Sequence, residues 1–263
     1  MKRRKLLIDT PQGRLRCIML SPRNQSTSLP GILWIHGGGY IGGTAAMVHV
    51  TKGKLLAKKY GAVVIAPAYR KARRHPYPAA FEDCCAALRY MHDNSEALGI
   101  NPEKLIVGGE SAGGGLAAAV CLYARDKARI PVLYQIPLYP MLDCRDTESS
   151  RDNHAHNWNT RKNHHAWKLY LRDLYTSPDV PKYASPSRES DYSGLPPCYT
   201  YVEDGEPFYD ETLTYVRNLN EAGVSAKADV FHGHTHAFDM FFWTRNAREA
   251  RRRILEAAEP YFR

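Results

Sequence analysis

The chain has 263 residues, 44% of them hydrophobic, and a formal net charge of +9 at pH 7. This length suits one α/β domain, and no apolar run approaches the roughly 18 residues of a membrane span. The charge comes mainly from residues 2–5, 70–74 and 245–253. A nucleic-acid-binding protein would need a recognisable binding fold or aromatic residues interleaved with such clusters, and neither is evident. The composition predicts a soluble globular protein with no nucleic-acid partner and solvated basic faces, although anionic surfaces could still attract it.

The six cysteines and the N-terminus bear on the cellular compartment. The cysteines are scattered and form no Cys-x-x-Cys pair, which indicates neither a disulfide framework nor a zinc cluster. Residues 2–5 imitate the basic start of a signal peptide, but Asp9 and Pro11 stop the apolar stretch after three residues. Such a stretch is too short for an export signal. We therefore expect reduced thiols and a cytoplasmic location.

Apolar runs typical of strands alternate with helical segments along the chain. Residues 6–8 and 15–20, joined by a turn at 11–13, predict an antiparallel hairpin. Further strands are expected at 32–35, 62–66, 105–107, 132–136, 199–202 and 226–231, and helices at 48–60, 78–98 and 111–125. Gly61 and Gly99 are expected to cap two of the helices. The alternation predicts an α/β fold with a mostly parallel eight-stranded sheet and helices on both faces.

One interval, between Asp143 and about Leu195, breaks this alternation. It is polar, rich in His, Tyr and Trp, and too long for a simple connecting loop. Residues 167–171 within it favour a helix. We interpret the chain as a single domain over residues 1–263, with a cap inserted at about 145–195.

Two glycine-rich motifs point to the same chemistry. Gly-x-Ser-x-Gly at 109–113, centred on Ser111, is typical of a nucleophile elbow, a sharp turn that exposes a serine hydroxyl. His-Gly-Gly-Gly at 36–39 follows the strand expected at 32–35, and its backbone N–H groups can stabilise an oxyanion. Together the motifs predict an acyl-transfer site with Ser111 as the nucleophile.

A serine hydroxyl becomes a good nucleophile when a histidine, oriented by a carboxylate, removes its proton. In this fold both partners follow the late strands. The candidate bases are His232, His234 and His236, and the candidate acids, among which the topology cannot choose, are Glu203, Asp204, Glu206 and Asp210. The three histidines also have a spacing that could suit a metal, but no matching Cys or carboxylate cluster supports a zinc site.

Five segments resemble the hormone-sensitive-lipase-like, or bacterial family IV, esterases of the α/β-hydrolase fold. The matching segments are residues 36–40, 69–70 with 75–80, 109–114, 183–186 with 195–197, and the late acid and histidine loops. They are spread over most of the chain. The resemblance implies a serine carboxylesterase that requires no metal or cofactor and acts on a small-molecule ester.

The resemblance also selects triad residues. The family's acid loop usually reads Asp-Pro-Leu-x-Asp, and residues 206–210 match it with a glutamate in the first place, which implies Glu206 as the acid. Asp204 is the alternative, and Asp210 is interpreted as a carboxylate at a helix start. The family's His-Gly-Phe corresponds to residues 236–238, which implies His236 as the base.

The remaining expectations concern the pocket. The oxyanion hole is expected to use the N–H groups of Gly37, Gly38 and Ala112, and four aromatic residues are expected to line the pocket or pack near it: Tyr40, Trp158, Trp167 and Tyr209. His36 comes too early to leave room for the N-terminal helical lid of many family members. We therefore expect a cap mainly from 145–195, and an open pocket for short acyl groups such as acetyl.

Two other functions could use these motifs. An acyltransferase would employ the same triad but protect the acyl-enzyme from water. A binding protein derived from a hydrolase would be expected to lose Ser111 or His236, and both are present. A homodimer is compatible with every one of these functions.

Overall fold

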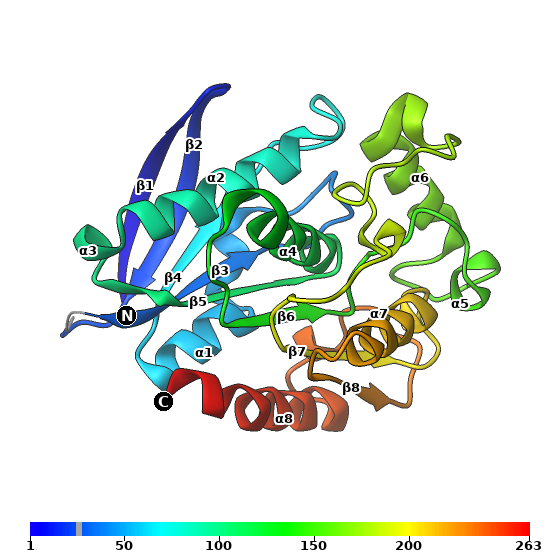
Figure 1. The fold of residues 1–263 in the computed structure, drawn as a ribbon. Helices are drawn as coiled ribbons and strands as arrows, with labels where there is room; N and C mark the ends of the chain where they lie inside the picture. Colours follow the sequence, from blue (N-terminus) through cyan, green and yellow to red (C-terminus); the bar gives the residue numbers. More distant parts are fainter. Residues whose placement is uncertain (25–27) are drawn as a thin grey trace.

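The computed structural model describes residues 1–24 and 28–263, and its centre is one eight-stranded sheet (Figure 1). The strands are β1 (Lys2–Thr10), β2 (Gly13–Ser21), β3 (Leu29–Ile35), β4 (Val63–Pro67), β5 (Ile100–Glu110), β6 (Tyr134–Leu138), β7 (Cys198–Glu203) and β8 (Ala226–Phe231). Their spatial order is β1-β2-β4-β3-β5-β6-β7-β8. β2 pairs antiparallel with β1 and β4, and the other neighbours are parallel. The predicted α/β-hydrolase sheet is confirmed.

Helices lie on both faces of the sheet. Two of the predicted helices are each divided into shorter segments. They are α1 (Lys52–Tyr60), α2 (Ala79–Asp93), α3 (Ser95–Leu98), α4 (Ala112–Tyr123), α5 (Glu148–Arg151), α6 (Thr160–Leu171), α7 (Tyr209–Glu221) and α8 (Arg245–Phe262). The helix predicted at 48–60 begins only at Lys52, because Thr51 is extended and residues 45–49 form a separate 3-10 turn. The helix predicted at 78–98 breaks at Asn94, whose side-chain amide donates to the Tyr90 carbonyl at 3.1 Å and so competes with the helix.

The ends of the helices that precede the predicted glycine caps were predicted more accurately than the helix starts. Gly61 and Gly99 both have left-handed backbone conformations, with φ of 71° and 69°, and follow α1 and α3. These are positions where a side chain would be disfavoured. The helix predicted at 111–125 is α4, which is followed by a π-helical turn over Ala124–Ala128.

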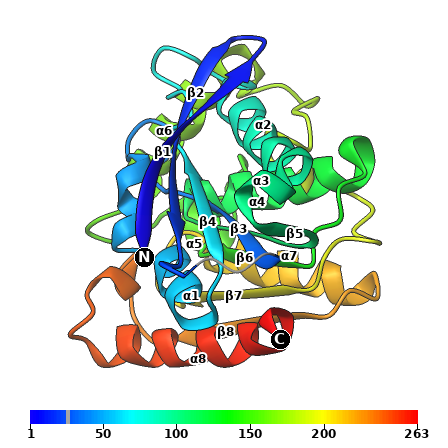
Figure 2. The same ribbon diagram turned by 90° about the vertical axis from the view of Figure 1, so that its left-hand side faces the viewer.

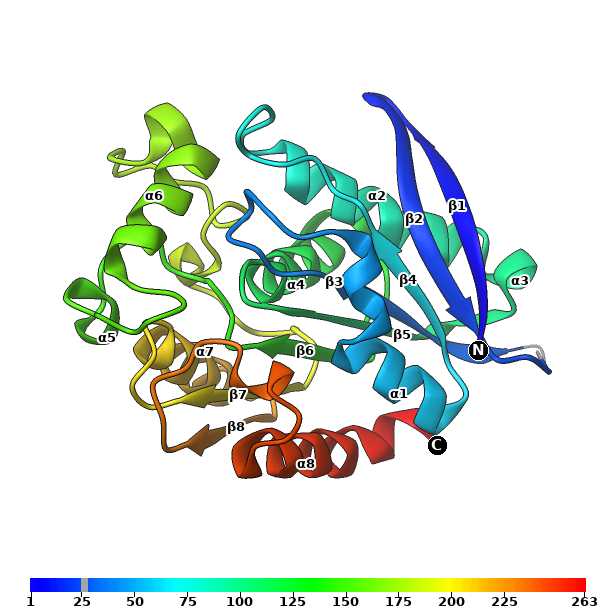
Figure 3. The same cartoon turned by 180° about the vertical axis from the view of Figure 1, so that it is seen from behind.

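Both faces of the sheet are buried because alternate side chains of the central strands enter different cores. Leu33 and Val107 join the core beneath α2, α4 and α7, whereas Ile32 and Ile106 join the core beneath α1 and α8. Figures 1 and 3 show the two helical layers from opposite sides. The small residues of α4 let that helix lie directly against the sheet, with each residue from Ala112 to Leu122 buried.

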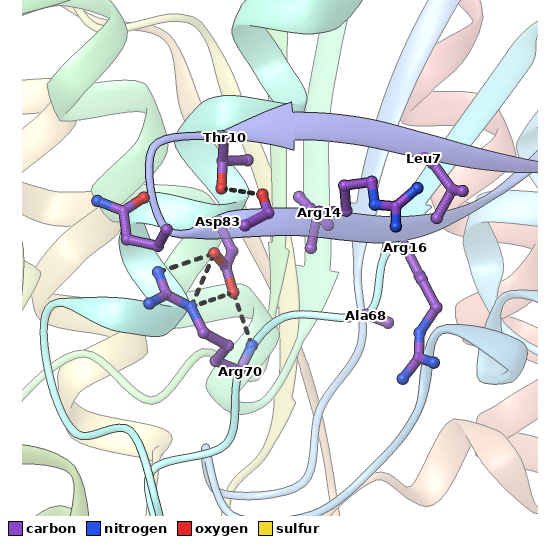
Figure 4. Close-up of a pocket in the computed structure, with 10 residues that line it drawn as sticks. Leu7, Thr10, Arg14, Arg16, Ala68, Arg70 and Asp83 are labelled. Atoms are coloured by element: carbon purple, nitrogen blue, oxygen red, sulfur yellow. Dashed lines mark hydrogen bonds and ion pairs between the residues drawn. The ribbon is translucent and has the colours of Figure 1, made fainter.

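A hollow of about 430 Å³ lies between the β1–β2 hairpin and the chain after β4 (Figure 4). At its edge the Arg70 guanidinium binds Asp83 at 2.9 Å, and the Arg70 backbone N–H donates to the same carboxylate at 2.8 Å. Asp83 is only 3% exposed. Arg70 therefore neutralises a buried carboxylate, which departs from the expectation that the cluster at 70–74 is simply a solvated face.

Residues 145–195 lie between β6 and β7, on the side of the molecule away from the β1–β2 hairpin (Figures 1 and 3). They form α5, α6 and two 3-10 turns, and the helix expected over 167–171 is the end of α6. The α6 rings of Trp167 and Tyr170 contact the Tyr40 ring, with centroids 5.4 and 3.9 Å away. The segment is thus packed onto the domain. None of the helices in the described ranges is long and apolar enough to cross a membrane.

Candidate active site

Ser111 stands at the turn between β5 and α4. Its φ of 57° lies in the left-handed region, which is uncommon for a residue with a side chain and marks a strained turn. Its N–H donates to the Leu138 carbonyl at 3.0 Å, and its carbonyl accepts from the Met141 N–H at 3.1 Å. Leu138 ends the neighbouring strand β6. The adjacent strand therefore holds the strained turn in place.

His236 connects Ser111 to Glu206 through its two ring nitrogens. Nε2 lies 2.8 Å from the Ser111 hydroxyl oxygen, and Nδ1 contacts Oε2 of Glu206. The three side chains follow β5, β7 and β8, so their contact depends on the sheet order. The whole residues are 6% exposed for Ser111, 5% for His236 and 0% for Glu206. The structure thus brings the predicted nucleophile, base and acid together in one buried chain of contacts.

Burial also sets the electrostatics of the acid. It raises the pKa of Glu206, and the His236 imidazole opposes that rise. Within the described ranges Oε1 of Glu206 is buried without a hydrogen-bond partner. The rings of Phe208 and Tyr139 stand edge-on to the imidazole, at centroid distances of 5.0 and 5.1 Å. These rings hold the imidazole between the carboxylate and the hydroxyl.

The other three candidate acids bind elsewhere. Their partners are the His232 ring for Asp204 at 2.8 Å, the Thr235 N–H for Glu203 at 2.8 Å, and the Ser149 N–H for Asp210 at 2.6 Å. His232 and His236 therefore contact different carboxylates. Across residues 1–24 and 28–263 no three His, Cys, Asp or Glu side chains gather in a way that could hold a metal ion.

The glycine loop after β3 lies directly against the nucleophile turn. A Cβ added to Gly37 would come within 2.8 Å of the Glu110 carbonyl oxygen and 3.2 Å of Ser111 Cβ, so only glycine permits this approach. Gly38 follows with φ of 118°, again disfavoured for a residue with a side chain. Ala112 is the first residue of α4 and is fully buried. Gly37 and Ala112 therefore border Ser111, with Gly38 next in the loop.

His36, the first residue of that loop, has a structural role. Burial, with a contribution from Lys71, lowers the pKa of His36 to about 3, so its ring is neutral near pH 7. The neutral ring donates from Nδ1 to the Gly37 carbonyl at 2.7 Å and accepts at Nε2 from Lys71 at 2.8 Å. Its face stacks on the Tyr69 ring at 4.2 Å. These contacts hold the glycine loop, and the family segment at 69–70 supplies one of them.

A buried polar network lies beneath His236, and the sequence analysis did not identify it. Its centre is Asp239, whose carboxylate accepts from Lys52 Nζ and from the hydroxyls of Tyr139 and Tyr201, both at 2.7 Å. Lys52 and Asp239 are 8% and 6% exposed. The network ties the histidine loop to α1, β7 and the chain after β6. Only the position of Asp239, three residues after His236, could have drawn attention to it.

A second group missed by the sequence analysis is Asn157, from the inserted segment. Its side-chain oxygen accepts from the His236 N–H at 3.1 Å, and its amide donates to the His236 carbonyl. Both backbone groups of the predicted base are thus held by one side chain of the segment at 145–195. Nothing in the local sequence around Asn157 distinguishes it from the other asparagines of this segment.

Of the aromatic residues predicted near the pocket, Trp158 lies nearest to the triad. Its ring centroid is 6.0 Å from that of His236, and its indole N–H is buried without a hydrogen-bond partner in the described part of the chain. Tyr40 and Trp167 are each only 1% exposed, and the Tyr40 hydroxyl donates to the Met141 carbonyl at 3.1 Å. Tyr209 packs against the α1–α8 core. These placements favour packing over substrate contact for Tyr40, Trp167 and Tyr209, because the core between helices and sheet takes up their rings.

The sequence and the fold were compared with known proteins. The pattern of a family described as alpha/beta hydrolase fold matches residues 32–240. Carboxylesterase NlhH of Mycobacterium tuberculosis is 31% identical over 205 residues, which cover 76% of this chain and 63% of that protein. An ethyl acetate hydrolase of Pseudomonas putida is 30% identical over 238 residues, covering 89% and 74%. A bacterial heroin esterase superposes with a TM-score of 0.95 at 34% identity, covering 100% of this chain and 84% of that one.

These matches establish the family. The chain spans less than two thirds of the mycobacterial carboxylesterase that it matches. The family pattern nevertheless includes the glycine loop, the Ser111 turn and His236, and the structural similarity extends over the whole chain. The chain belongs to the α/β-hydrolase fold family, among its hormone-sensitive-lipase-like esterases.

Proposed function

We propose that this protein is a carboxylic ester hydrolase in which Ser111 is the nucleophile, His236 the base and Glu206 the acid that orients the base. The observation that carries the proposal is the continuous contact from the Ser111 hydroxyl through both His236 nitrogens to the buried Glu206 carboxylate. The names of the related proteins, which include a carboxylesterase and an ethyl acetate hydrolase, support the same reaction class.

The reaction proceeds in two halves. Ser111 Oγ attacks the ester carbonyl carbon while its proton passes to His236 Nε2. Glu206 stabilises the resulting imidazolium through Nδ1 and keeps Nε2 directed at the serine. The tetrahedral adduct then collapses, the ester C–O bond breaks, and His236 gives its proton to the departing alcohol. Water activated by the same imidazole attacks the acyl-enzyme, releases the carboxylic acid and restores Ser111.

Backbone N–H groups stabilise the negative charge on the carbonyl oxygen. We assign this role to Gly37, Gly38 and Ala112, each worth about 10²–10³ in kcat. The close approach of Gly37 to the Ser111 turn supports the assignment, since a Cβ at Gly37 would collide with it. Because these donors belong to a strained turn and a glycine loop, they need no reorganisation when the charge develops.

The substrates we propose are short-chain acyl esters, acetyl esters among them. Residues 145–195 serve as a cap, because Asn157 binds the His236 backbone and Trp158 lies beside its ring. The large apolar side chains of α6, Trp167 and Tyr170, are already buried against Tyr40. The cap therefore offers little apolar surface for a long acyl chain. The similarity to an ethyl acetate hydrolase supports the same size class.

Hydrolysis of p-nitrophenyl acetate, butyrate and palmitate by the purified protein tests both parts of the proposal. We expect the two short esters to be hydrolysed much faster than the palmitate, and Ser111→Ala to abolish turnover of all three. Equal or faster hydrolysis of the palmitate would overturn the short-chain assignment. Absence of turnover with every ester would overturn the esterase assignment. Transfer of acetyl to an added alcohol in preference to water would identify an acyltransferase.

A further inference from the structure

A cluster of exposed apolar side chains follows the catalytic histidine loop. Met240, Phe241, Phe242 and Trp243 are consecutive, and their exposed fractions are 46%, 39%, 75% and 62%. Val50, which precedes α1, is 73% exposed. Figure 2 shows the chain between β8 and α8 projecting beside α1. Contiguous apolar surface of this kind is uncommon on a protein with no partner and marks a contact site. We call these five residues the aromatic cluster.

Basic side chains surround the aromatic cluster. A groove of about 640 Å³ is lined by Val50, Met240 and Phe242 together with Lys54, Lys58, Arg248 and Arg251. At its margin burial lowers the pKa of His49, with further contributions from Arg3 and Lys54, which places the basic start of β1 nearby. Apolar and cationic groups therefore share one face. The buried Lys52–Asp239 pair forms part of the groove lining, and the exposed apolar and basic side chains lie outside the contacts of Ser111, His236 and Glu206.

Lys52 is paired with Asp239 inside the groove, but the outer basic groups Lys58, Arg248 and Arg251 differ from Arg252 and Arg253 of α8, which bind carboxylates. In the described ranges Lys58, Arg248 and Arg251 form no ion pair with a carboxylate, whereas their neighbours on α8 do. On the same helix Arg252 binds Glu249 and Glu256, at 2.5 and 2.6 Å. Arg248 and Arg251 are three residues apart and so lie on one side of the helix, toward the groove. One side of α8 is internally neutralised and the other presents uncompensated positive charge.

This combination selects one kind of partner. If a second copy of this chain docked here by twofold symmetry, the basic groups of the two copies would face each other. Such a contact is unfavourable for a chain of net charge +9. Phe and Trp side chains on a projecting loop, flanked by Lys and Arg, are typical of proteins that insert into the interface of an anionic bilayer. We propose that the aromatic cluster and its basic border dock the protein peripherally onto membranes that contain anionic lipids.

The location of the cluster adds a consequence for the proposed function. Phe242 and Trp243 lie six and seven residues after His236, and the buried Lys52–Asp239 ion pair anchors the start of the loop to α1. A membrane bound at the cluster would therefore lie close to the histidine loop, and esters partitioned into the bilayer would be concentrated near it. Binding itself requires no ester hydrolysis, so it can be tested separately.

Co-sedimentation with vesicles of non-hydrolysable ether lipids tests the proposal, using the Ser111→Ala protein. We expect binding to vesicles with 30% anionic phosphoglycerol lipid to exceed binding to purely zwitterionic phosphocholine vesicles by about ten-fold or more, and to weaken in 0.5 M salt. Brominated lipid should quench Trp243 fluorescence, and the quenching should be lost in Trp243→Ser, which separates Trp243 from the partly buried Trp158; Trp34 and Trp167 are each 1% exposed. Equal, negligible binding to both vesicle types would overturn the proposal.

Paired variants locate the surface. Phe242→Ser with Trp243→Ser, and separately Arg248→Gln with Arg251→Gln, should each lower binding by about ten-fold or more. Matched controls are Leu7→Ser, which changes a 56% exposed leucine on β1, and Arg161→Gln with Lys168→Gln on α6. The controls should bind as well as the parent. Reactivity of Ser111 in the same variants on a wild-type background checks that each folds. Loss of self-association in the Phe242 and Trp243 variant, with vesicle binding unchanged, would instead identify a protein interface and overturn the proposal.

Discussion

Two carboxylate–imidazole pairs span the same two loops, but only one of them reaches the serine. The loop after β7 carries Asp204 and Glu206, and the loop after β8 carries His232 and His236. The side chains of the Asp204–His232 pair are 38% and 98% exposed. Those of the Glu206–His236 pair are 0% and 7% exposed. The two pairs have the same chemistry and nearly the same place in the sequence, so the difference between them is one of burial and direction.

That difference changes what each pair can do. Hydrogen bonding from the Gly233 N–H, followed by His232, lowers the pKa of Asp204, whereas burial raises the pKa of Glu206. The exposed pair is screened by water and salt. The buried carboxylate lies in a medium of low dielectric, where the positive charge that the proposed reaction places on His236 would be stabilised far more strongly. Burial therefore distinguishes the pair suited to catalysis from the pair that joins two surface loops.

The largest expected effect comes from removing the charge of each acid in turn. Glu206→Gln should lower kcat for a short ester by about 10³–10⁴-fold, because His236 loses its charge partner and its favoured tautomer. Asp204→Asn should change kcat by less than about three-fold, since the bond that it weakens is at the surface. Steady-state kinetics on both variants measures the contrast. The reverse ranking would assign the orienting role to Asp204.

A smaller effect is expected from Asn157, the residue of the 145–195 segment that binds the His236 backbone. Asn157→Ala removes both side-chain bonds to the His236 backbone and should lower kcat on the order of 10-fold to 100-fold, with KM little changed. Asn159→Ala is the matched control, because Asn159 only caps α6 through the Lys162 N–H at 3.1 Å. It should reduce thermal stability and leave kcat near the wild-type value. Equal kcat in the two variants would show that the cap does not position the base.

The smallest expected effect concerns a third carboxylate, Glu110, next to Ser111. Burial, together with the nearby Asp239 charge, raises the pKa of Glu110 to about 8. Between about pH 6.5 and 8 the folded protein therefore binds a proton that the unfolded chain has lost, since a free glutamate titrates near 4.3. The free energy of unfolding should fall as the pH rises through this window, by up to about 1.4 kcal/mol per pH unit. The pKa of His36, lowered to about 3, changes the free energy of unfolding with pH only below about pH 6.5.

Urea denaturation at several pH values measures this slope. Glu110→Gln should reduce it between about pH 6.5 and 8, because glutamine carries no proton to lose, and the contribution of Glu206 and Glu211, whose pKa values burial also raises, should remain. Asp204→Asn should leave it unchanged, since the lowered pKa of Asp204 affects stability only in acid. An identical slope in wild type and Glu110→Gln would mean that this carboxyl group is already ionised in the folded protein.

The sequence predicted the elements whose signals are local and missed the contacts that join distant elements. The hairpin, the strand series and the glycine caps at Gly61 and Gly99 were confirmed, because alternation and turn chemistry act over a few residues. Helix extents were less accurate: one predicted helix begins four residues late because Thr51 is extended, and another breaks at Asn94, whose side chain competes for a backbone carbonyl.

The candidate site divides in the same way. The motif-bearing loops of Ser111, Glu206 and His236 were each identified from a few residues, and their catalytic roles remain predictions. The network around Asp239 draws its members from separate elements, so no short pattern marks it. Tyr40 was expected to line the pocket or pack near it, and its packing against α6 decides its burial. Such contacts arise from long-range packing.

Labelling with a serine-directed fluorophosphonate tests the central claim most directly, because it reports nucleophile activation without assuming a substrate. Wild-type protein should be labelled at Ser111, as located by peptide mass spectrometry. His236→Ala should lose labelling, since nothing would accept the serine proton, whereas His232→Ala and His234→Ala should label at the wild-type rate. Loss of labelling in His232→Ala or His234→Ala as complete as in His236→Ala would contradict the assignment of the buried pair as the catalytic one.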